Sequence, residues 1–251
     1  MKVVVLGCGG SAGVPNIGGA DGAGDWGACD PDEPRNRRTR PSIVVESADG
    51  RRVLVDTSPD MRAQLLACRI PSVDAVLFTH AHADHIAGID DVRILNRIAD
   101  RPLDAVGTAE TLEELARRYA YVFAPWTGPC FYRPVMTPRI VEFGQGHGRV
   151  DSIGFRIGPF AYSTDVVELD DAAFAALAGI DTWLVGCFLR EGRHTTHANL
   201  DLALRWVERL RPRRTVLTHM GPGMDWAWMR ANLPPGVEPA FDGMEMSFPE
   251  T

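Results

Sequence analysis

The sequence has few cysteines, and their spacing fits no common cysteine-based structure. There are five, an odd number, and no two of them form a C-x-x-C pair. This excludes a recognisable disulfide framework and a cysteine zinc ribbon. Reduced thiols are typical of the cytoplasm, so we predict a cytoplasmic protein.

Long hydrophobic runs are also lacking. The apolar stretch at Val3–Leu6 gives way at once to glycines and is too short for a signal peptide. No later run approaches the length of a membrane-spanning helix. We therefore expect a soluble protein without a membrane partner.

The chain has fewer basic than acidic residues. The chain has 26 Lys and Arg against 33 Asp and Glu, which gives a formal net charge of -7. Proteins that hold long nucleic acid over a wide basic face have the opposite balance. The charge thus argues against long nucleic acid as a partner, whereas a small anionic substrate remains compatible with it.

The pattern of the remaining residues predicts a mixed α/β class in one domain covering residues 1–251. A chain of 251 residues, 45% of them hydrophobic, can bury a substantial core, and no composition shift marks a boundary. Short β-branched runs predict strands: Val3–Leu6, Ser42–Glu46, Val53–Val55, Ala75–Phe78, Ile140–Phe143, Phe155–Ile157, Trp183–Val185 and Thr215–Leu217. Apolar stripes predict helices at Glu110–Phe123 and Asp201–Leu210, and Gly18–Asp32 is expected to form a surface loop.

The segment Thr79–His85 reads T-H-A-H-A-D-H and follows an apolar strand. Side chains alternate along an extended chain, so His80 and His82 should point to the same side and can share one metal ion. Asp84 and His85 lie at the turn into a helix and suit a second ion. Imidazole and carboxylate ligands suit zinc, manganese or iron. A lone histidine after a strand more often makes only hydrogen bonds, but four ligands in six residues favour metal binding.

Three further candidate ligands each come just after an apolar segment: His147, Asp165 and His219. Each alone is more often an ordinary loop residue, yet together with the first motif they predict a site for two ions. Two ions about 3.5–4 Å apart can bridge one water, lower its pKa and assist displacement at phosphorus or at a carbonyl carbon. Asp165 is the candidate for the bridging carboxylate.

Two polar segments supply candidates for the remaining roles. His197 and His194 lie in a polar loop before the Asp201 helix, and an uncoordinated histidine suits the role of general acid. The alternative for either is helix capping or support of a ligand. Asn36, Arg38 and Arg40 could contact a phosphate, or they could belong to a solvated basic loop.

The motif at Thr79–His85 resembles the T-H-x-H-x-D-H ligand motif of the metallo-β-lactamase superfamily, which implies an αββα four-layer sandwich. Within that superfamily, the segments Gly7–Pro15, Pro34–Ser42, Val55–Asp60, Gly88–Arg93 and Thr218–Met220 resemble PhnP-type cyclic phosphate phosphodiesterases.

The resemblance implies a complete set of site roles. One Zn²⁺ or Mn²⁺ would be bound by His80, His82 and His147, the second ion by Asp84, His85 and His219, and both by Asp165. His197 would be the acid that protonates the leaving oxygen.

The sequence departs from these relatives at one place. They often carry a C-x-C-x-x-C cluster after the Val-Pro turn, completed by a histidine three residues beyond the last active-site ligand. Here only Cys29 remains of the cluster, and Pro222 stands at the histidine position. We therefore expect no structural zinc, and a Gly18–Asp32 loop that is held by other means.

The leading prediction is a dinuclear metal-dependent phosphodiesterase that acts on a small phosphate ester, such as a cyclic phosphate, or on a nucleotide. A thioesterase or lactonase would use the same metal motif, since fold does not determine substrate. RNA processing of the ribonuclease Z kind shares the motif but fits poorly with the acidic charge. A metal-binding module without activity is the non-enzyme alternative, and a homodimer is left open.

Overall fold

The computed structural model describes residues 1–141 and 152–249. The chain forms two compact units, and neither is a continuous segment. The first unit contains residues 1–7, 41–141 and 243–249, and the second contains residues 8–40 and 152–242. The single domain expected from the sequence stays a prediction.

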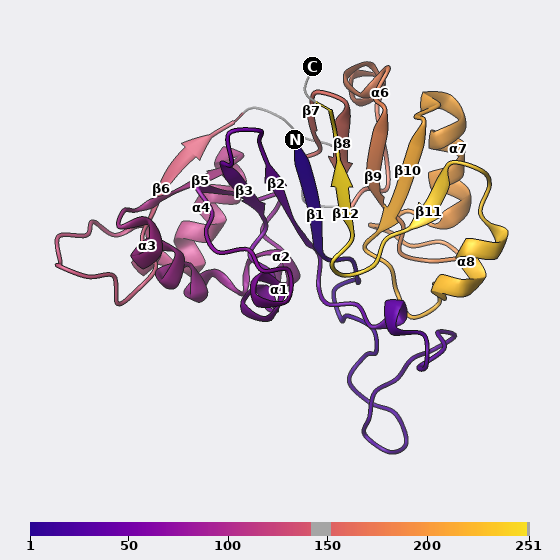
Figure 1. The fold of residues 1–251 in the computed structure, drawn as a ribbon, viewed down its shortest axis with the longest axis horizontal. Coiled ribbons are helices and arrows are strands. Elements are labelled where there is room, and N and C mark those ends of the chain that lie inside the picture. Colours follow the sequence, from indigo (N-terminus) through magenta and orange to yellow (C-terminus); the bar gives the residue numbers. More distant parts are fainter. Residues whose placement is uncertain (142–151, 250–251) are drawn as a thin grey trace. The chain divides into compact units, whose positions relative to one another are not determined.

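The first unit is built on a seven-stranded sheet with the order β12-β1-β2-β3-β4-β5-β6 (Figure 1). The strands are β1 (Lys2–Gly7), β2 (Ser42–Glu46), β3 (Arg52–Val55), β4 (Ala75–Leu77), β5 (Leu103–Gly107), β6 (Met136–Ile140) and β12 (Glu245–Ser247). From β12 to β3 neighbouring strands are antiparallel, and from β3 to β6 they are parallel. Strand β4, within the parallel part, ends at Leu77, just before the predicted metal motif begins at Thr79.

Five helices of the first unit bury an apolar face: α1 (Met61–Ala67), α2 (Ala83–Ile86), α3 (Val92–Ala99), α4 (Ala109–Arg118) and α5 (Ala120–Phe123). Alternate residues of the sheet, among them Leu54 and Val76, form one hydrophobic cluster with Leu65, Ile86 and Leu115 of these helices. Because strand side chains alternate between faces, the helices cover one face of this sheet.

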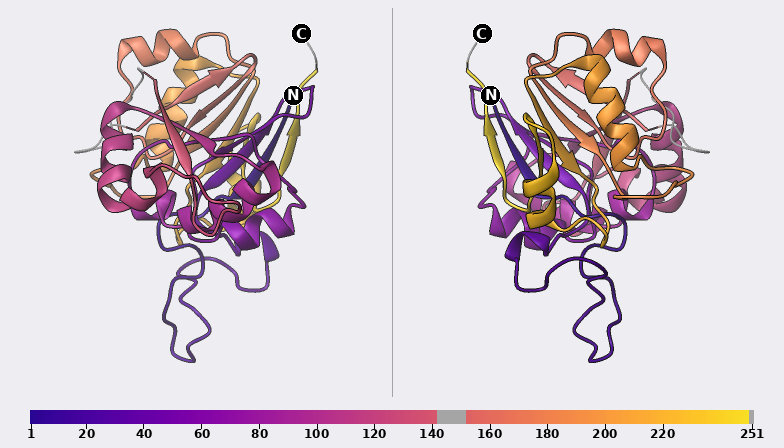
Figure 2. Two further views of the ribbon diagram at one scale, coloured as in Figure 1. Left: turned by 90° about the vertical axis from the view of Figure 1, so that its left-hand side faces the viewer. Right: turned by 90° about the vertical axis from the view of Figure 1, so that its right-hand side faces the viewer.

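The second unit has a five-stranded sheet with the order β11-β10-β9-β8-β7. Its strands are β7 (Phe155–Ile157), β8 (Phe160–Ser163), β9 (Thr182–Gly186), β10 (Arg214–Thr218) and β11 (Val237–Pro239). Strands β8 to β11 run parallel, and β7 is antiparallel to β8. The helices α6 (Asp171–Leu177), α7 (Leu200–Leu210) and α8 (Trp226–Asn232) lie beside this sheet (Figures 1 and 2).

Most predicted elements are confirmed, and two differ in their extent. The helix predicted at Glu110–Phe123 is divided at Tyr119, whose φ of -126° and ψ of 47° leave the helical region. The strand predicted at Ile140–Phe143 instead begins at Met136 and ends at Ile140, and Phe143 lies outside the described residues. Pro138 obscured this strand in the sequence, but β6 is an edge strand, where proline is tolerated.

A long loop leads from β1 to β2 and contains the predicted surface loop Gly18–Asp32 (Figure 1). Ala28 N donates to Pro222 O at 2.8 Å, and the Cys29 thiol donates to the same oxygen at 3.3 Å. Asp225 Oδ2 accepts from both Asp30 N and Asn36 Nδ2. These bonds tie the loop to the segment between β10 and α8.

No helix among the described residues is both long enough and apolar enough to cross a membrane.

Candidate metal-binding site

Four of the predicted ligands lie together in the first unit. Strand β4 ends at Leu77, and the loop after it leads through His80 and His82 into α2, which contains Asp84 and His85. The His80 ring lies 4.5 Å from the His82 ring and 4.2 Å from the His85 ring, measured between centroids. Asp84 Oδ2 lies 3.3 Å from His85 Nε2. The ligand cluster predicted at Thr79–His85 is therefore compact.

A buried carboxylate that the sequence prediction did not assign to the site holds this cluster in place. Asp56, directly after β3, has its Oδ2 at 2.7 Å from His85 Nδ1. The same carboxylate accepts from Thr79 N at 2.7 Å and from Thr79 Oγ1 at 2.8 Å. With Nδ1 donating to Asp56, the His85 ring presents Nε2 for a metal ion. Burial raises the pKa of Asp56, and its contacts with His85 and Thr79 oppose that rise.

Backbone contacts fix the segment that carries Asp56 against α2. Thr57 N donates to His85 O, and Gly88 N donates to Thr57 O, each at 2.8 Å. A Cβ atom at Gly88 would lie 2.0 Å from Ser58 O, so no other residue fits there without a backbone shift. The glycine thus permits the close approach that places Asp56 beside His85.

A second cluster forms in the other unit, at one edge of its sheet. Strands β8, β9 and β10 are parallel neighbours, so their carboxyl ends meet at the same edge. Asp165 follows β8, and His219 follows β10. Asp165 Oδ1 lies 3.0 Å from His219 Nε2 and accepts from Thr164 Oγ1 at 2.7 Å. His197 Nδ1 lies 3.7 Å from Asp165 Oδ2.

Aromatic contacts join the histidines of this second cluster. The rings of His197 and His219 are stacked at 4.8 Å, and the rings of His194 and His197 lie 4.7 Å apart. Phe188, just after β9, contacts all three rings. His194 is exposed and His197 half-buried. The predicted general acid is thus next to two predicted ligands, Asp165 and His219.

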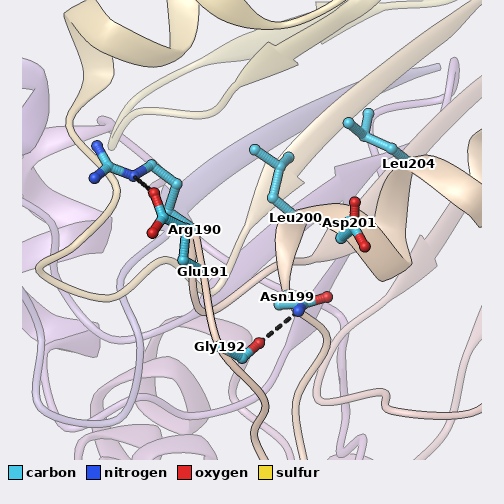
Figure 3. A pocket seen from close by; sticks show the side chains of 7 residues that line it. All are labelled: Arg190, Glu191, Gly192, Asn199, Leu200, Asp201 and Leu204. Atoms are coloured by element: carbon cyan, nitrogen blue, oxygen red, sulfur yellow. Dashed lines mark hydrogen bonds and ion pairs between the residues drawn. The ribbon is translucent and has the colours of Figure 1, made fainter.

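Hydrogen bonds at Asn199 close the loop that carries His194 and His197. Asn199 Nδ2 donates to Gly192 O (Figure 3), and Asn199 Oδ1 accepts from Leu202 N in the first turn of α7. A depression of about 320 Å³ lies here, between Arg190–Gly192 and the start of α7 (Figure 3). These hydrogen bonds of Asn199 fix the end of the loop to the first turn of α7.

Backbone strain coincides with both clusters. Six residues other than glycine have a positive φ in the described parts of the chain, and three of them are Asp56 (65°), Asp165 (47°) and His219 (53°). Such conformations cost of order 1–3 kcal/mol each and tend to cluster at functional sites. Neither the metal motif nor the strand pattern predicted them.

The other predicted site residues have different surroundings. Asn36 and Arg38 are buried, and Arg38 Nη2 donates to Asn36 Oδ1 at 2.9 Å and to Met224 O at 2.6 Å. Arg40 is half-buried. His147 lies outside the described residues. Substrate contacts by Asn36, Arg38, Arg40 and His194 stay predictions.

The fold and the ligand motif can be compared with known proteins. Residues 51–220, more than half of the chain, match the family model of the β-lactamase superfamily domain. The chain belongs to the metallo-β-lactamase superfamily. The predicted α/β fold of this superfamily is thereby confirmed. Its two sheets with their helices, the His and Asp clusters and the relatives also support a metal-binding hydrolase.

Three relatives show how far the similarity extends. A crystal structure of a new diphosphatase from the PhnP family superposes with a TM-score of 0.87 at 32% identity, over 99% of this chain and 98% of that one. The Zn²⁺-bound PqqB from Methylobacterium extorquens shares the fold, with a TM-score of 0.74 at 19% identity over 99% of this chain and 100% of that one. An octanoyltransferase of Porphyromonas gingivalis is 28% identical over 98% of this chain, which spans 51% of that protein.

Proposed function

We propose that this superfamily member is a dinuclear metal-dependent phosphodiesterase that hydrolyses a small phosphate ester, such as a cyclic phosphate or a nucleotide. The observation that carries the proposal is the position of His197. Its ring stacks on His219, and its Nδ1 faces the Asp165 carboxylate at 3.7 Å. A phosphodiester with an alkoxide leaving group requires a proton donor of this kind.

The donor set fits divalent metal ions. Histidine nitrogens and carboxylate oxygens are typical ligands of Zn²⁺ and also bind Mn²⁺. The hydrogen bond from His85 Nδ1 to Asp56 is typical support for a metal-binding imidazole. In our proposal His80, His82 and His147 would hold one ion, Asp84, His85 and His219 would hold the other, and Asp165 would be a ligand of both.

Bound divalent ions would supply Lewis-acid polarisation of the phosphate and a water of lowered pKa. His197 supplies what the ions do not, which is the proton for the leaving oxygen. With Nδ1 directed toward Asp165, Nε2 is the atom that we assign to this transfer. The neighbouring carboxylate orients the imidazole.

The PhnP-family diphosphatase supports a substrate that contains phosphate, because it is named for the cleavage of a diphosphate and is 32% identical over nearly the whole of both chains. The net charge of -7 supports a small substrate rather than long RNA of the kind that a ribonuclease Z processes.

A second candidate is hydrolysis of an acyl thioester or a lactone. The P. gingivalis relative is named for the transfer of an octanoyl group, and this chain matches about half of its length. A thioester would not need His197 as a proton donor to the same extent, since a thiolate leaves readily, whereas the alkoxide that a lactone releases would need a proton. Dependence of the activity on His197 therefore distinguishes the phosphodiester from the thioester.

The first experiment is a substrate panel with metal-reconstituted protein. Protein loaded with Mn²⁺ or Zn²⁺ is tested on 2′,3′-cyclic nucleotides, octanoyl thioesters and lactones, with a chelated sample as control. We expect metal-dependent cleavage of the cyclic phosphates. Cleavage of only the thioester or the lactone would replace the phosphodiesterase proposal by the second candidate.

The variant His197→Ala then tests the proton donor. We expect turnover of the cyclic nucleotide to fall by about 10²–10⁴-fold, the usual contribution of a general acid, while both ions stay bound. The matched control is Thr195→Ala, an exposed residue of the same loop. Unchanged turnover in His197→Ala would remove this role from His197.

A further inference from the structure

Phe188 lies in the middle of the second cluster although its side chain can neither bind a metal ion nor carry a proton. Its ring centroid is 5.3 Å from that of His194, 5.2 Å from that of His197 and 6.1 Å from that of His219. The three pairs are inclined at 68°, 47° and 57°, arrangements that are favourable for aromatic rings. One phenyl ring therefore contacts the proposed acid and one proposed ligand at the same time.

Two glycines form a slot for this ring. A Cβ atom at Gly10 would lie 2.6 Å from Phe188 Cε2, and a Cβ atom at Gly221 would lie 3.0 Å from the same carbon. Real Cβ atoms essentially never come within 3.0 Å of an atom of a residue that is distant in the chain, so a side chain at Gly10 would force the Phe188 ring to move. These glycines stand in the Gly7–Pro15 segment and just after Thr218–Met220, so the slot gives both segments a packing role.

Backbone hydrogen bonds tie Phe188 to the segments that carry the histidines. Phe188 N donates to Ala198 O at 2.9 Å, next to His197. Gly221 N donates to Phe188 O at 3.0 Å, two residues after His219. The ring is thus fixed to the same short segments whose imidazoles it contacts.

We propose that Phe188 is a positioning residue that sets the orientation of the His197 imidazole, and with it the protonation of the leaving oxygen. This inference rests on the proposed role of His197 as the acid. A misplacement of about 1 Å in such a group can cost roughly 100-fold in rate. Phe188 should therefore matter most for substrates whose leaving oxygen must be protonated.

Two variants disturb the ring in different ways, and a third is the control. Phe188→Leu removes the ring, whereas Gly10→Ala keeps it and displaces it. Gly223→Ala is the matched control, because nothing lies within 4 Å of a Cβ atom there. Gly10 and Gly223 do not have a positive φ, so the backbone tolerates alanine at both positions.

The experiment compares how far kcat falls for two phosphodiesters that differ in their leaving group. For a 2′,3′-cyclic nucleotide, whose leaving group is an alkoxide, we expect kcat to fall roughly 100-fold in Phe188→Leu and Gly10→Ala. For bis(4-nitrophenyl) phosphate, whose leaving group needs no proton, we expect little change. In a His197→Ala background, Phe188→Leu should have no further effect. An equal loss on both substrates, or a full further loss in that background, would overturn the proposal.

A spectroscopic measurement separates this inference from the proposed function. In the zinc-loaded protein, the ¹⁵N signals of the His197 ring, which report its hydrogen bonding and to which a ring current adds little, should shift in Phe188→Leu and in Gly10→Ala but not in Gly223→Ala. If the wild-type protein cleaves neither phosphodiester, the phosphodiesterase proposal fails while the NMR result still decides whether Phe188 positions His197. Unmoved His197 signals would overturn the positioning role whatever the substrate is.

Discussion

The cluster at Thr79–His85 and the cluster of Asp165, His197 and His219 differ in what holds their side chains. The first comes from a single short segment, and one buried carboxylate, Asp56, bonds to both its backbone and its side chains. The second gathers residues from three separated segments that ring contacts join. The first cluster therefore depends mainly on the hydrogen bonds of Asp56, whereas in the second the packing of rings accompanies the contacts of Asp165 with His219 and His197.

This difference has consequences for how each cluster responds to mutation. Removing one partner of a buried, charge-assisted hydrogen bond leaves the other group without a hydrogen bond, which lowers the free energy of unfolding. An aromatic contact contributes only about 0.5–1.5 kcal/mol, and its loss allows small movements instead. We expect variants of Asp56 to weaken metal binding, whereas variants of Phe188 should displace the His197 ring.

The largest effect is expected at the residue that we propose to bind both ions. Asp165→Ala should lower activity to the level of chelated protein and reduce the bound metal below two ions per chain, because both ions lose a ligand. Metal analysis and turnover are measured together. Asp171→Ala, an exposed aspartate of the same unit, is the control. Two ions retained in Asp165→Ala would show that the second cluster does not depend on this carboxylate.

The next effect tests the support of the first cluster. Asn can adopt the left-handed backbone of Asp56, so Asp56→Asn removes mainly the negative charge and the bond from His85. Loss of such support typically lowers metal affinity by about 10–100-fold. Competition with a chromogenic chelator measures the affinity, and Asp49→Asn, in an exposed turn, is the control. Equal affinities in the three proteins would contradict the role of Asp56.

The same difference explains what could be predicted from the sequence. His80, His82, Asp84 and His85 were recognisable because one motif contains them all. Asp165 and His219 could be proposed because each follows a strand. The structure places these two together, since β8 and β10 are parallel neighbours of β9.

The supporting residues could not be predicted in this way. Asp56 reaches His85 only because β3 pairs with β4, and a strand pairing is not visible in a single sequence. Phe188 looks like any apolar residue after a strand until the glycine slot is known. The division of the predicted helix at Tyr119 likewise depends on tertiary packing, because Leu115 and Val122 on either side of it both join the core of the first unit.

A smaller effect, on stability, is expected at Arg38 in the loop between β1 and β2. Arg38 is buried, and a charged group contributes about 1.5–3 kcal/mol through each such hydrogen bond. Arg38→Met should therefore lower the free energy of unfolding by about 3 kcal/mol, measured by urea denaturation. If Arg38 also contacts the substrate, KM will rise as well. Arg40→Ala is the comparison for KM. A raised KM with unchanged stability in Arg38→Met would make it a substrate contact rather than a loop anchor.

The smallest effect appears only at alkaline pH and concerns Cys187, which precedes Phe188. Burial raises the pKa of its thiol from 9.0 to about 12. Above about pH 9 the unfolded chain therefore loses this proton while the folded protein keeps it, so stability falls as the pH rises toward 12, by up to roughly 1.4 kcal/mol per pH unit. Below pH 9 the thiol has no such effect.

Urea denaturation at about pH 8 and about pH 10.5 measures this loss in wild-type protein, in Cys187→Ala and in a control, Cys130→Ala, which changes an exposed thiol. Because alanine cannot ionise, Cys187→Ala should lose less stability between the two pH values than the other two proteins. The loss of stability at alkaline pH would then come partly from the Cys187 thiol, which is next to Phe188 of the second cluster. An equal loss in all three proteins would mean that the buried Cys187 thiol does not contribute to it.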